Sequence, residues 1–228
     1  MKKVTAIIPA RGGSKGIPRK NLQKINGIPL VGHSILQAQK ASNINQIFVS
    51  TEDNEISKVS RQFGAETIGR PADLVNDNTF MEVDRLLIWT VQLLEEKKIH
   101  SDIIVLLYPT SPLRKIQHIE ATVSKVLEED YNSALTLTED TSYLWITKED
   151  GTASPTNYDP LKRGPRQKEK WNQWVENKAV YAVEKNLLMK EGCRLGGRIG
   201  WVKMDKLEST DIDNPEDLLL ANAIINML

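Results

Sequence analysis

Short apolar runs alternate with segments whose apolar residues recur at helical spacing along most of the chain. The first run, residues 4–8, is bounded by Pro9 and has the length and composition of a buried strand. The run over residues 102–107 is the most hydrophobic, which predicts a central place in a parallel sheet. The further runs that we predict to be strands cover residues 46–50, 66–68, 133–137, 180–183 and 199–204.

The segments between these runs predict helices, several of which begin at good capping residues. Asp53 and Thr79 are expected to cap helices that end near residues 63 and 96, and Asn214 with Pro215 opens a terminal helix. Further helices are predicted over residues 29–41, with Pro29 in the first turn, 116–129 and 186–190. Strands that alternate with helices predict an α/β fold with a doubly wound sheet, in which ligands bind beyond the carboxyl ends of the strands.

The alternation stops between residues 139 and 174. This segment is polar, contains several prolines and carries Trp145, Trp171 and Trp174. Because a structureless loop of that length is unusual in a compact domain, we predict a hairpin or arm inserted in a single domain that spans residues 1–228. Exposed tryptophans on such an arm indicate a subunit interface. An arm folded back on its own domain is the alternative.

Composition narrows the class of protein. Of the 228 residues, 40% are hydrophobic and 26% charged, as in ordinary globular proteins. Lys+Arg and Asp+Glu both number 30, so the formal net charge is zero, which argues against nucleic acid as the main partner. No apolar run approaches the ~20 residues of a membrane helix. The single cysteine, Cys193, fits a reducing compartment, and we expect a cytoplasmic protein with no membrane partner.

The most informative stretch follows the first predicted strand and reads ARGGSKGIPRKN over residues 10–21. Its glycines let backbone amides approach a ligand, and Arg11, Lys15, Arg19 and Lys20 concentrate positive charge in the same loop. At the carboxyl end of a strand this combination predicts a polyphosphate site. The spacing matches neither the P-loop nor the dinucleotide fingerprint. A solvated basic turn is the alternative, but it would not need adjacent glycines after a buried strand.

Two carboxylates lie two residues apart between the last predicted strand and the last helix. In an extended segment Asp211 and Asp213 point to one face, while Ile212 points to the core. Two convergent carboxylates without cysteine or histidine suit a hard ion, and we therefore predict Mg²⁺ as the cofactor. The alternative is that these acids only complement a helix N-terminus, a role that fits Glu216 and Asp217 better.

Together these motifs resemble those of the cytidylyltransferases that activate acidic sugars, especially the CMP-N-acylneuraminate (CMP-sialic acid) synthetases. The resemblance spans nearly the whole chain and is most specific over residues 8–16 with Lys20-Asn21. The other motifs follow in the order typical of the family: Ser50-Thr51-Glu52-Asp53, Arg70-Pro71-x-x-Leu74, Thr110-Ser111-Pro112-Leu113-Arg114, Gly164-Pro165-Arg166-Gln167 and Ser209-Thr210-Asp211-Ile212-Asp213.

The resemblance implies both a fold and a reaction. The fold would be a Rossmann-like, doubly wound mixed sheet of the nucleotide-diphospho-sugar transferase type, with Mg²⁺ as cofactor and a homodimer joined through the arm. The reaction would couple CTP to the anomeric hydroxyl of a nonulosonic acid, a 2-keto-3-deoxy sugar acid of the sialic or legionaminic kind. The products would be a CMP-sugar and pyrophosphate.

The resemblance also assigns roles by position. Arg11 and Lys20 would stabilise charge on the triphosphate, and Asp211 is the candidate base for the sugar hydroxyl, directly or through a water. The residues implied to bind the sugar are Tyr108, Arg166 and Gln167, with Arg166 on its carboxylate, and those implied to bind the metal are Asp211 and Asp213. The residues implied to bind the nucleotide are Ala10, Arg11, Gly12, Gly13, Ser14, Lys15, Lys20, Asn21 and Arg70.

Two departures from the family leave the sugar open. Tyr108 stands where the sialic acid enzymes usually carry a glutamine against the sugar, and residues 192–198 replace an aromatic pair. Both lie at the sugar end of the site, so legionaminic acid, a deaminated nonulosonate or another acidic sugar fits as well as sialic acid. Another nucleotide or a sugar 1-phosphate on the same fold stays open, as does a non-catalytic nucleotide sensor. A sensor would not need Lys20, Asp211 and Asp213 together.

Overall fold

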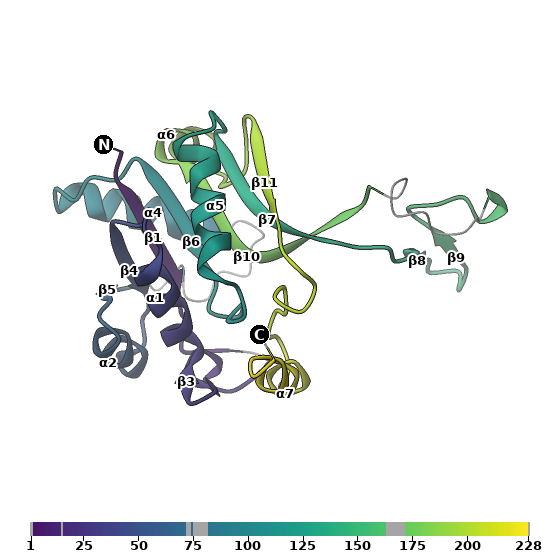
Figure 1. Ribbon diagram of the computed structural model, residues 1–228, viewed down its shortest axis with the longest axis horizontal. Helices are drawn as coiled ribbons and strands as arrows, with labels where there is room; N and C mark the ends of the chain where they lie inside the picture. The colour runs from purple at the N-terminus through teal and green to yellow at the C-terminus, as the bar shows by residue number, and fades with distance from the viewer. Residues whose placement is uncertain (1, 15, 72–73, 75–81, 163–171, 228) are drawn as a thin grey trace.

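The computed structural model describes residues 2–14, 16–71, 74, 82–162 and 172–227, and its centre is a twisted sheet (Figure 1). The strands of this sheet are β1 (Val4–Pro9), β4 (Gln46–Ser50), β5 (Glu66–Ile68), β6 (Ile103–Leu107), β7 (Ser133–Glu139), β10 (Trp174–Glu184) and β11 (Ile199–Lys203). They lie in the order β11-β7-β10-β6-β1-β4-β5, and β10 runs antiparallel to both of its neighbours. The mixed sheet agrees with the resemblance, and β6 is central as predicted, but the parallel surroundings predicted for β6 hold only on the side of β1, because β10 is antiparallel to it.

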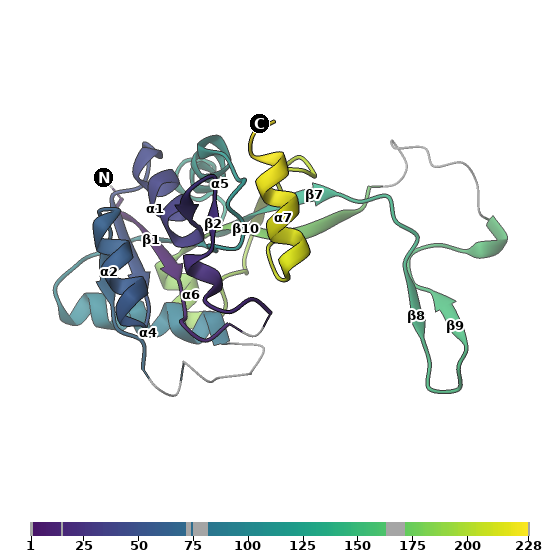
Figure 2. The ribbon, with the colours of Figure 1, turned by 90° about the horizontal axis from the view of Figure 1, so that it is seen from below.

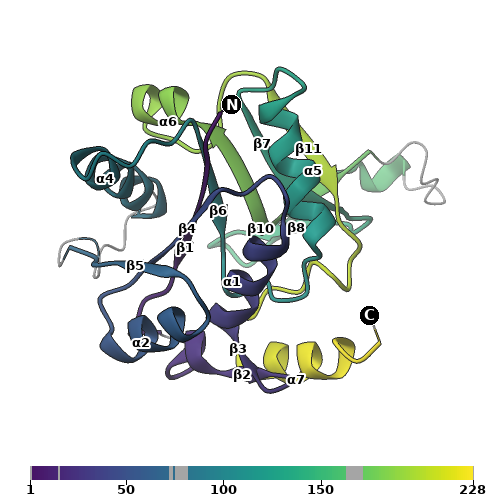
Figure 3. The same cartoon turned by 60° about the vertical axis from the view of Figure 1, so that its left-hand side comes forward.

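Helices cover both faces of the sheet because successive residues of each inner strand point to opposite sides. The helices are α1 (Leu30–Lys40), α2 (Asn54–Gln62), α4 (Glu82–Glu96), α5 (Ile116–Leu127), α6 (Lys185–Glu191) and α7 (Pro215–Ile224), with short 3₁₀ turns η1 (Lys20–Leu22) and η2 (Pro160–Lys162). One core joins Ile8 of β1 to α1, α2 and α5, whereas Ile7 packs with α4 and α6. Figure 3 shows these two groups of helices on opposite sides of the sheet.

The helix ends largely follow the sequence signals. Asp53 caps α2 by accepting hydrogen bonds from the amides of Glu55 and Ile56, both at 2.9 Å. Pro29 directly precedes α1 instead of lying in its first turn. The predicted cap Thr79 lies outside the described residues, although α4 ends at Glu96 as expected.

A small hairpin that the sequence analysis did not predict packs against residues 10–21, named the phosphate loop for its predicted role. Strands β2 (Lys24–Ile25) and β3 (Ile28–Pro29) are joined by Asn26 and Gly27, both with positive φ. Asn-Gly is the strongest short signal for such a turn, so the sequence does carry it. Ile25 packs with α7 and with Ile212, which ties the carboxylate segment to this hairpin.

The segment between residues 139 and 174 leaves the body of the molecule. Trp174 pairs with Glu139, and beyond this pair β7 and β10 continue into an extension that carries the hairpin β8 (Trp145–Thr147) and β9 (Ala153–Pro155) (Figure 2). Trp145 and Ile146 are about half exposed there. Strand β10 is longer than the predicted 180–183. The sequence pattern did not indicate its outer half, because that half is polar and its pairing with β7 is irregular between Glu176 and Tyr181.

Candidate active site

A cavity of about 450 Å³ opens beyond the carboxyl ends of β1 and β6. The chain passes from β1 to β4 on one side and returns to β6 on the other, so the cavity lies at the switch point where such folds bind ligands. Its charged lining residues are Arg11, Lys20, Arg70, Lys178, Asp211 and Asp213. Of the other residues predicted for the site, those that line the cavity are Ser14, Asn21 and Tyr108.

The remaining predicted residues fall into two groups. Lys15, Arg166 and Gln167 lie outside the described residues. Ala10, Gly12 and Gly13 belong to the loop but are not among the cavity's lining residues. The side chain of Ala10 is buried in the core, and its amide donates to the Ser50 carbonyl at 2.9 Å.

The glycines of the loop serve close packing within the protein itself. A Cβ on Gly12 would lie 2.5 Å from an oxygen of Asp53, and one on Gly16 would lie 2.1 Å from the Asp213 carbonyl oxygen. The Gly12 amide donates to Glu52 Oε1 at 2.7 Å, so a carboxylate occupies this donor. Gly13 differs from these two, because a Cβ there would meet nothing within 4 Å.

Not every cation of the loop faces the cavity. Arg19 turns away and pairs with Asp53 and Glu55, and its hydrogen bonds hold the pKa of Asp53 below the usual value. Asn21 is buried and donates to the Arg11 carbonyl at 2.9 Å, so it braces the loop from within the cavity wall. The loop therefore directs Arg11 and Lys20 to the cavity and uses Arg19 to fix its own shape.

The carboxylate pair meets two ammonium groups. Lys20 Nζ lies 3.0 Å from Asp213 Oδ1 and 2.9 Å from the Ile212 carbonyl, and Lys178 Nζ lies 3.0 Å from Asp211 Oδ2. Ile212 is fully buried, so its two neighbours share the outer face, as predicted. Burial opposes the charged form of Asp213, but the hydrogen bond and charge of Lys20 outweigh it and hold the pKa of Asp213 below its usual value.

This pair offers ligands that fit a magnesium ion. Asp211 Oδ1 is buried and makes no hydrogen bond within the described part of the chain, so one carboxylate oxygen is available to a cation. Hard oxygen donors suit Mg²⁺, which commonly takes one or two carboxylates and completes its shell with water and substrate phosphates. The described residues contain no cluster of three or more His, Cys, Asp or Glu suited to a metal. Among them, Asp211 and Asp213 are the two carboxylates that line the cavity.

A family model described as "Cytidylyltransferase" matches residues 5–218. The chain belongs to the cytidylyltransferase family. The match includes the phosphate loop, the carboxylate pair and the strands that carry them. The nucleotidyltransferase fold predicted from the motifs is therefore confirmed.

The names of individual relatives of this cytidylyltransferase refer to acidic sugars. N-acylneuraminate cytidylyltransferase A of Danio rerio is 30% identical over 92% of the chain and 48% of its own length. CMP-N,N'-diacetyllegionaminic acid synthase of Legionella pneumophila is 36% identical over 53% of the chain and 52% of its own length. The chain thus spans about half the length of these relatives. A solved structure described as CMP:2-keto-3-deoxy-manno-octonic acid synthetase complexed with CTP shares the fold, with a TM-score of 0.71, 19% identity and 99% coverage of both chains.

Aromatic and charged side chains lie next to Tyr108, which lines the cavity. The Tyr108 ring contacts the edge of Tyr181, with centroids 6.3 Å apart, and the Arg194 guanidinium lies 4.8 Å from the centre of Tyr181. Arg194 in turn pairs with the buried Asp84 at 2.9 Å. Burial raises the pKa of Tyr108 to about 12, so its hydroxyl keeps its proton at neutral pH and can donate or accept a hydrogen bond.

The sequence analysis assigned no role in the site to two residues, although one of them, Arg114, belongs to a motif that it named. Arg114 is buried and donates to the carbonyls of Tyr108 at 2.7 Å and Ala179 at 3.1 Å, which fixes two walls of the cavity. Burial lowers its pKa to about 9, which still leaves the guanidinium charged at neutral pH. Lys178 lies in a polar stretch that carries no strand or motif signal.

The described residues include no helix long and apolar enough to cross a membrane.

Proposed function

We propose that this chain transfers CMP from CTP to the anomeric hydroxyl of a nonulosonic acid and releases pyrophosphate. The observation that carries the proposal is a cavity that Arg11, Lys20 and Arg70 line together with the carboxylates Asp211 and Asp213. Cations suit a triphosphate, and paired carboxylates suit its metal. The names of the sequence relatives support CMP transfer to an acidic sugar.

In the proposed reaction, the anomeric oxygen forms a bond to the α-phosphorus of CTP. The bond from that phosphorus to the pyrophosphate oxygen breaks, and pyrophosphate leaves with the electron pair. The hydroxyl proton passes to the carboxylate of Asp211, directly or through a water. Such transfers depend mainly on positioning and on neutralising negative charge, which Arg11 and Lys20 would do from the phosphate loop.

Mg²⁺ is the cofactor we propose, with Asp211 and Asp213 as its protein ligands. When bound, the ion would supply positive charge next to the phosphates. The free oxygen Asp211 Oδ1 and the proximity of the phosphate loop support this assignment.

For the sugar, the proposal covers sialic and legionaminic acids and other acidic nonulosonates. Tyr108 offers a protonated hydroxyl and an aromatic edge to the ring substituents. Arg166 and Gln167 remain proposed sugar contacts from the sequence, with Arg166 directed at the carboxylate because a guanidinium binds that group with two hydrogen bonds. We also propose a cytoplasmic homodimer joined through the extension between β7 and β10, whose exposed Trp145 and Ile146 support an interface.

The experiment is pyrophosphate release from purified protein with Mg²⁺, each of the four nucleoside triphosphates and a panel of 2-keto-3-deoxy sugar acids. We expect release with CTP and at least one nonulosonic acid, and none with CTP alone. Pyrophosphate release with a different nucleoside triphosphate, and not with CTP, would show that this nucleotide is the substrate in place of CTP. Tight CTP binding without release from any pair would favour the nucleotide sensor instead.

A further inference from the structure

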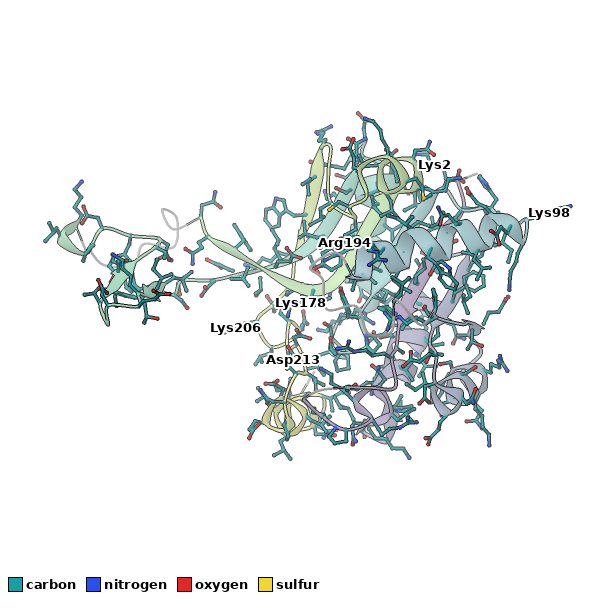
Figure 4. The ribbon with its side chains drawn as sticks, turned by 180° about the vertical axis from the view of Figure 1, so that it is seen from behind. Lys2, Lys98, Lys178, Arg194, Lys206 and Asp213 are labelled. Atoms are coloured by element: carbon teal, nitrogen blue, oxygen red, sulfur yellow. The ribbon has the colours of Figure 1, made fainter. Side chains whose placement is uncertain are left out.

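Lys178 holds a place that neither its sequence context nor the phosphate loop explains. Its Nζ lies 3.0 Å from Asp211 Oδ2 and 4.0 Å from Asp213 Oδ2, between the two carboxylates proposed as metal ligands. Figure 4 labels Lys178, a residue of β10, and shows Asp213 below it in the same region of the molecule. A cation bound by both carboxylates would compete with this ammonium group for the same negative charge.

The backbone holds Lys178 in place at a cost. Its φ is 59°, in the left-handed region that glycine adopts more easily than lysine. The next residue is fixed, because the Ala179 carbonyl accepts from Arg114 at 3.1 Å. The preceding Asn177 donates to Ser209 Oγ at 2.9 Å, which ties this bend to the segment that carries Asp211. Backbone strain held by its surroundings is typical of functional positions.

We propose that Lys178 is a tethered counter-ion that neutralises the carboxylate pair until a divalent cation replaces it. Its side chain is 55% exposed and lines the same cavity as Arg11 and Arg70, so the ammonium group has room to turn to an anion there once released. The cavity would then bind cation and triphosphate together, because the Lys178 ammonium group that the cation displaces would pair with the triphosphate. This inference rests on the proposed function in taking Asp211 and Asp213 as the metal ligands.

The test is a Mn²⁺ titration of the purified protein without nucleotide or sugar, with the free ion followed by EPR. Lys178→Gln removes the charge and keeps nearly the same length, and we expect it to tighten Mn²⁺ binding at least about five-fold, since a positive group no longer competes with the ion. Lys178→Arg keeps the charge and should change the affinity by less than about two-fold. Thermal unfolding of each variant checks that the fold is retained.

Lys203→Gln is the matched control. This lysine is 53% exposed and pairs with Glu139 at 3.6 Å, so the substitution removes the same charge away from the carboxylate pair. We expect it to leave Mn²⁺ binding unchanged. The double variant with Lys178→Gln and Asp211→Asn should lose the tightening, because the ion would lack a ligand.

Unchanged or weaker Mn²⁺ binding by Lys178→Gln would overturn the proposal. Equal tightening in Lys203→Gln, or tightening that survives Asp211→Asn, would overturn it too, because the ion would then respond to net charge or bind elsewhere. Pyrophosphate release from CTP is measured separately on the wild-type protein. If the protein releases no pyrophosphate but shows the expected Mn²⁺ pattern, the proposed function is rejected and the counter-ion role of Lys178 is supported.

Discussion

At the scale of single residues, Gly16 shows how tightly the phosphate loop packs on the carboxylate segment. A Cβ at this position would lie 2.1 Å from the Asp213 carbonyl oxygen, a backbone atom that cannot rotate away. We expect Gly16→Ala to lower the free energy of unfolding by about 1–3 kcal/mol, because the loop must shift to remove the clash. Urea denaturation measures this.

Gly13→Ala is the comparison for that prediction, since a Cβ there meets nothing within 4 Å. It should change the free energy of unfolding by less than about 0.5 kcal/mol. Equal stability of the two variants would show that the contact between Gly16 and Asp213 does not constrain the loop.

Asp211 is the residue on which the proposed chemistry depends most. Asp211→Asn keeps the size of the side chain and removes its charge, so we expect kcat for pyrophosphate release to fall at least about 10²-fold while the protein stays folded. Asp205→Asn, an exposed acid earlier in the same loop, should leave kcat unchanged. Near-normal turnover by Asp211→Asn would reject Asp211 both as base and as essential metal ligand.

At the scale of elements, the start of α7 positions the second carboxylate. Asn214 Oδ1 accepts from the Asp217 amide at 2.9 Å, and Asp217 Oδ2 accepts from the amides of Asn214 at 3.0 Å and Asp213 at 2.9 Å. We expect Asn214→Ala to lower the free energy of unfolding by about 1 kcal/mol and to weaken Mn²⁺ binding, because Asp213 loses a fixed backbone. Chemical denaturation and the EPR titration measure the two effects.

Asn214→Ser keeps a side chain that caps helices well, so both quantities should stay close to those of the wild-type protein. If Ser and Ala behave alike at position 214, the cap does not hold the carboxylate segment.

Element bounds were predictable from the sequence where the signal is local. The first strand, α2 with its Asp53 cap and α7 with its Asn214 cap agree with the structure within about two residues, because each depends on neighbouring side chains. Strand β10 was predicted too short. Its outer half contains the polar residues Glu176, Asn177 and Lys178. Pairing of residues 174–176 with β7, not an apolar alternation, makes this part a strand, and the pairing is interrupted between Glu176 and Tyr181.

At the scale of the whole molecule, stability should depend on pH through buried histidine. Burial lowers the pKa of His33, which lies in α1 with its ring Nε2 2.9 Å from the Ile25 carbonyl. Below about pH 6.5 the unfolded chain therefore binds more protons than the folded one, and the free energy of unfolding falls as the pH decreases. Burial also lowers the pKa of His118, which adds an effect of the same sign.

We expect His33→Gln to lose stability less steeply than the wild-type protein between pH 7 and pH 5. The slope that one histidine contributes is at most about 1.4 kcal/mol per pH unit. Urea denaturation across this range gives both slopes. Parallel curves for the two proteins would mean that His33 does not cause the loss.

The extension between β7 and β10 leads to a prediction for the assembly. Leu144, Trp145 and Ile146 are consecutive apolar residues that are 45%, 51% and 53% exposed, and a contiguous apolar patch is typical of a surface covered by a partner. We expect Ile146→Glu to shift the mass measured by light scattering from two chains toward one. Leu219→Glu, on an exposed leucine of α7, should leave the mass unchanged. A single-chain mass for the wild-type protein would reject the dimer.

Several features follow from the sequence by itself. The order of strands and helices, the phosphate loop and the shared face of Asp211 and Asp213 depend on periodicity and on short-range sterics, which any segment carries within its own residues. The family resemblance followed from the same motifs and was confirmed by the match over residues 5–218.

Only the tertiary structure decided which charges meet. Arg19 turns from the cavity to Asp53, and Arg114 joins the Tyr108 and Ala179 carbonyls across the sheet. Lys178 reaches Asp211, 33 residues further along the chain. The contacts made by Ala179 and Lys178 depend on how β10 pairs between β6 and β7, and the residues around Lys178 carry no apolar alternation from which that pairing could be inferred.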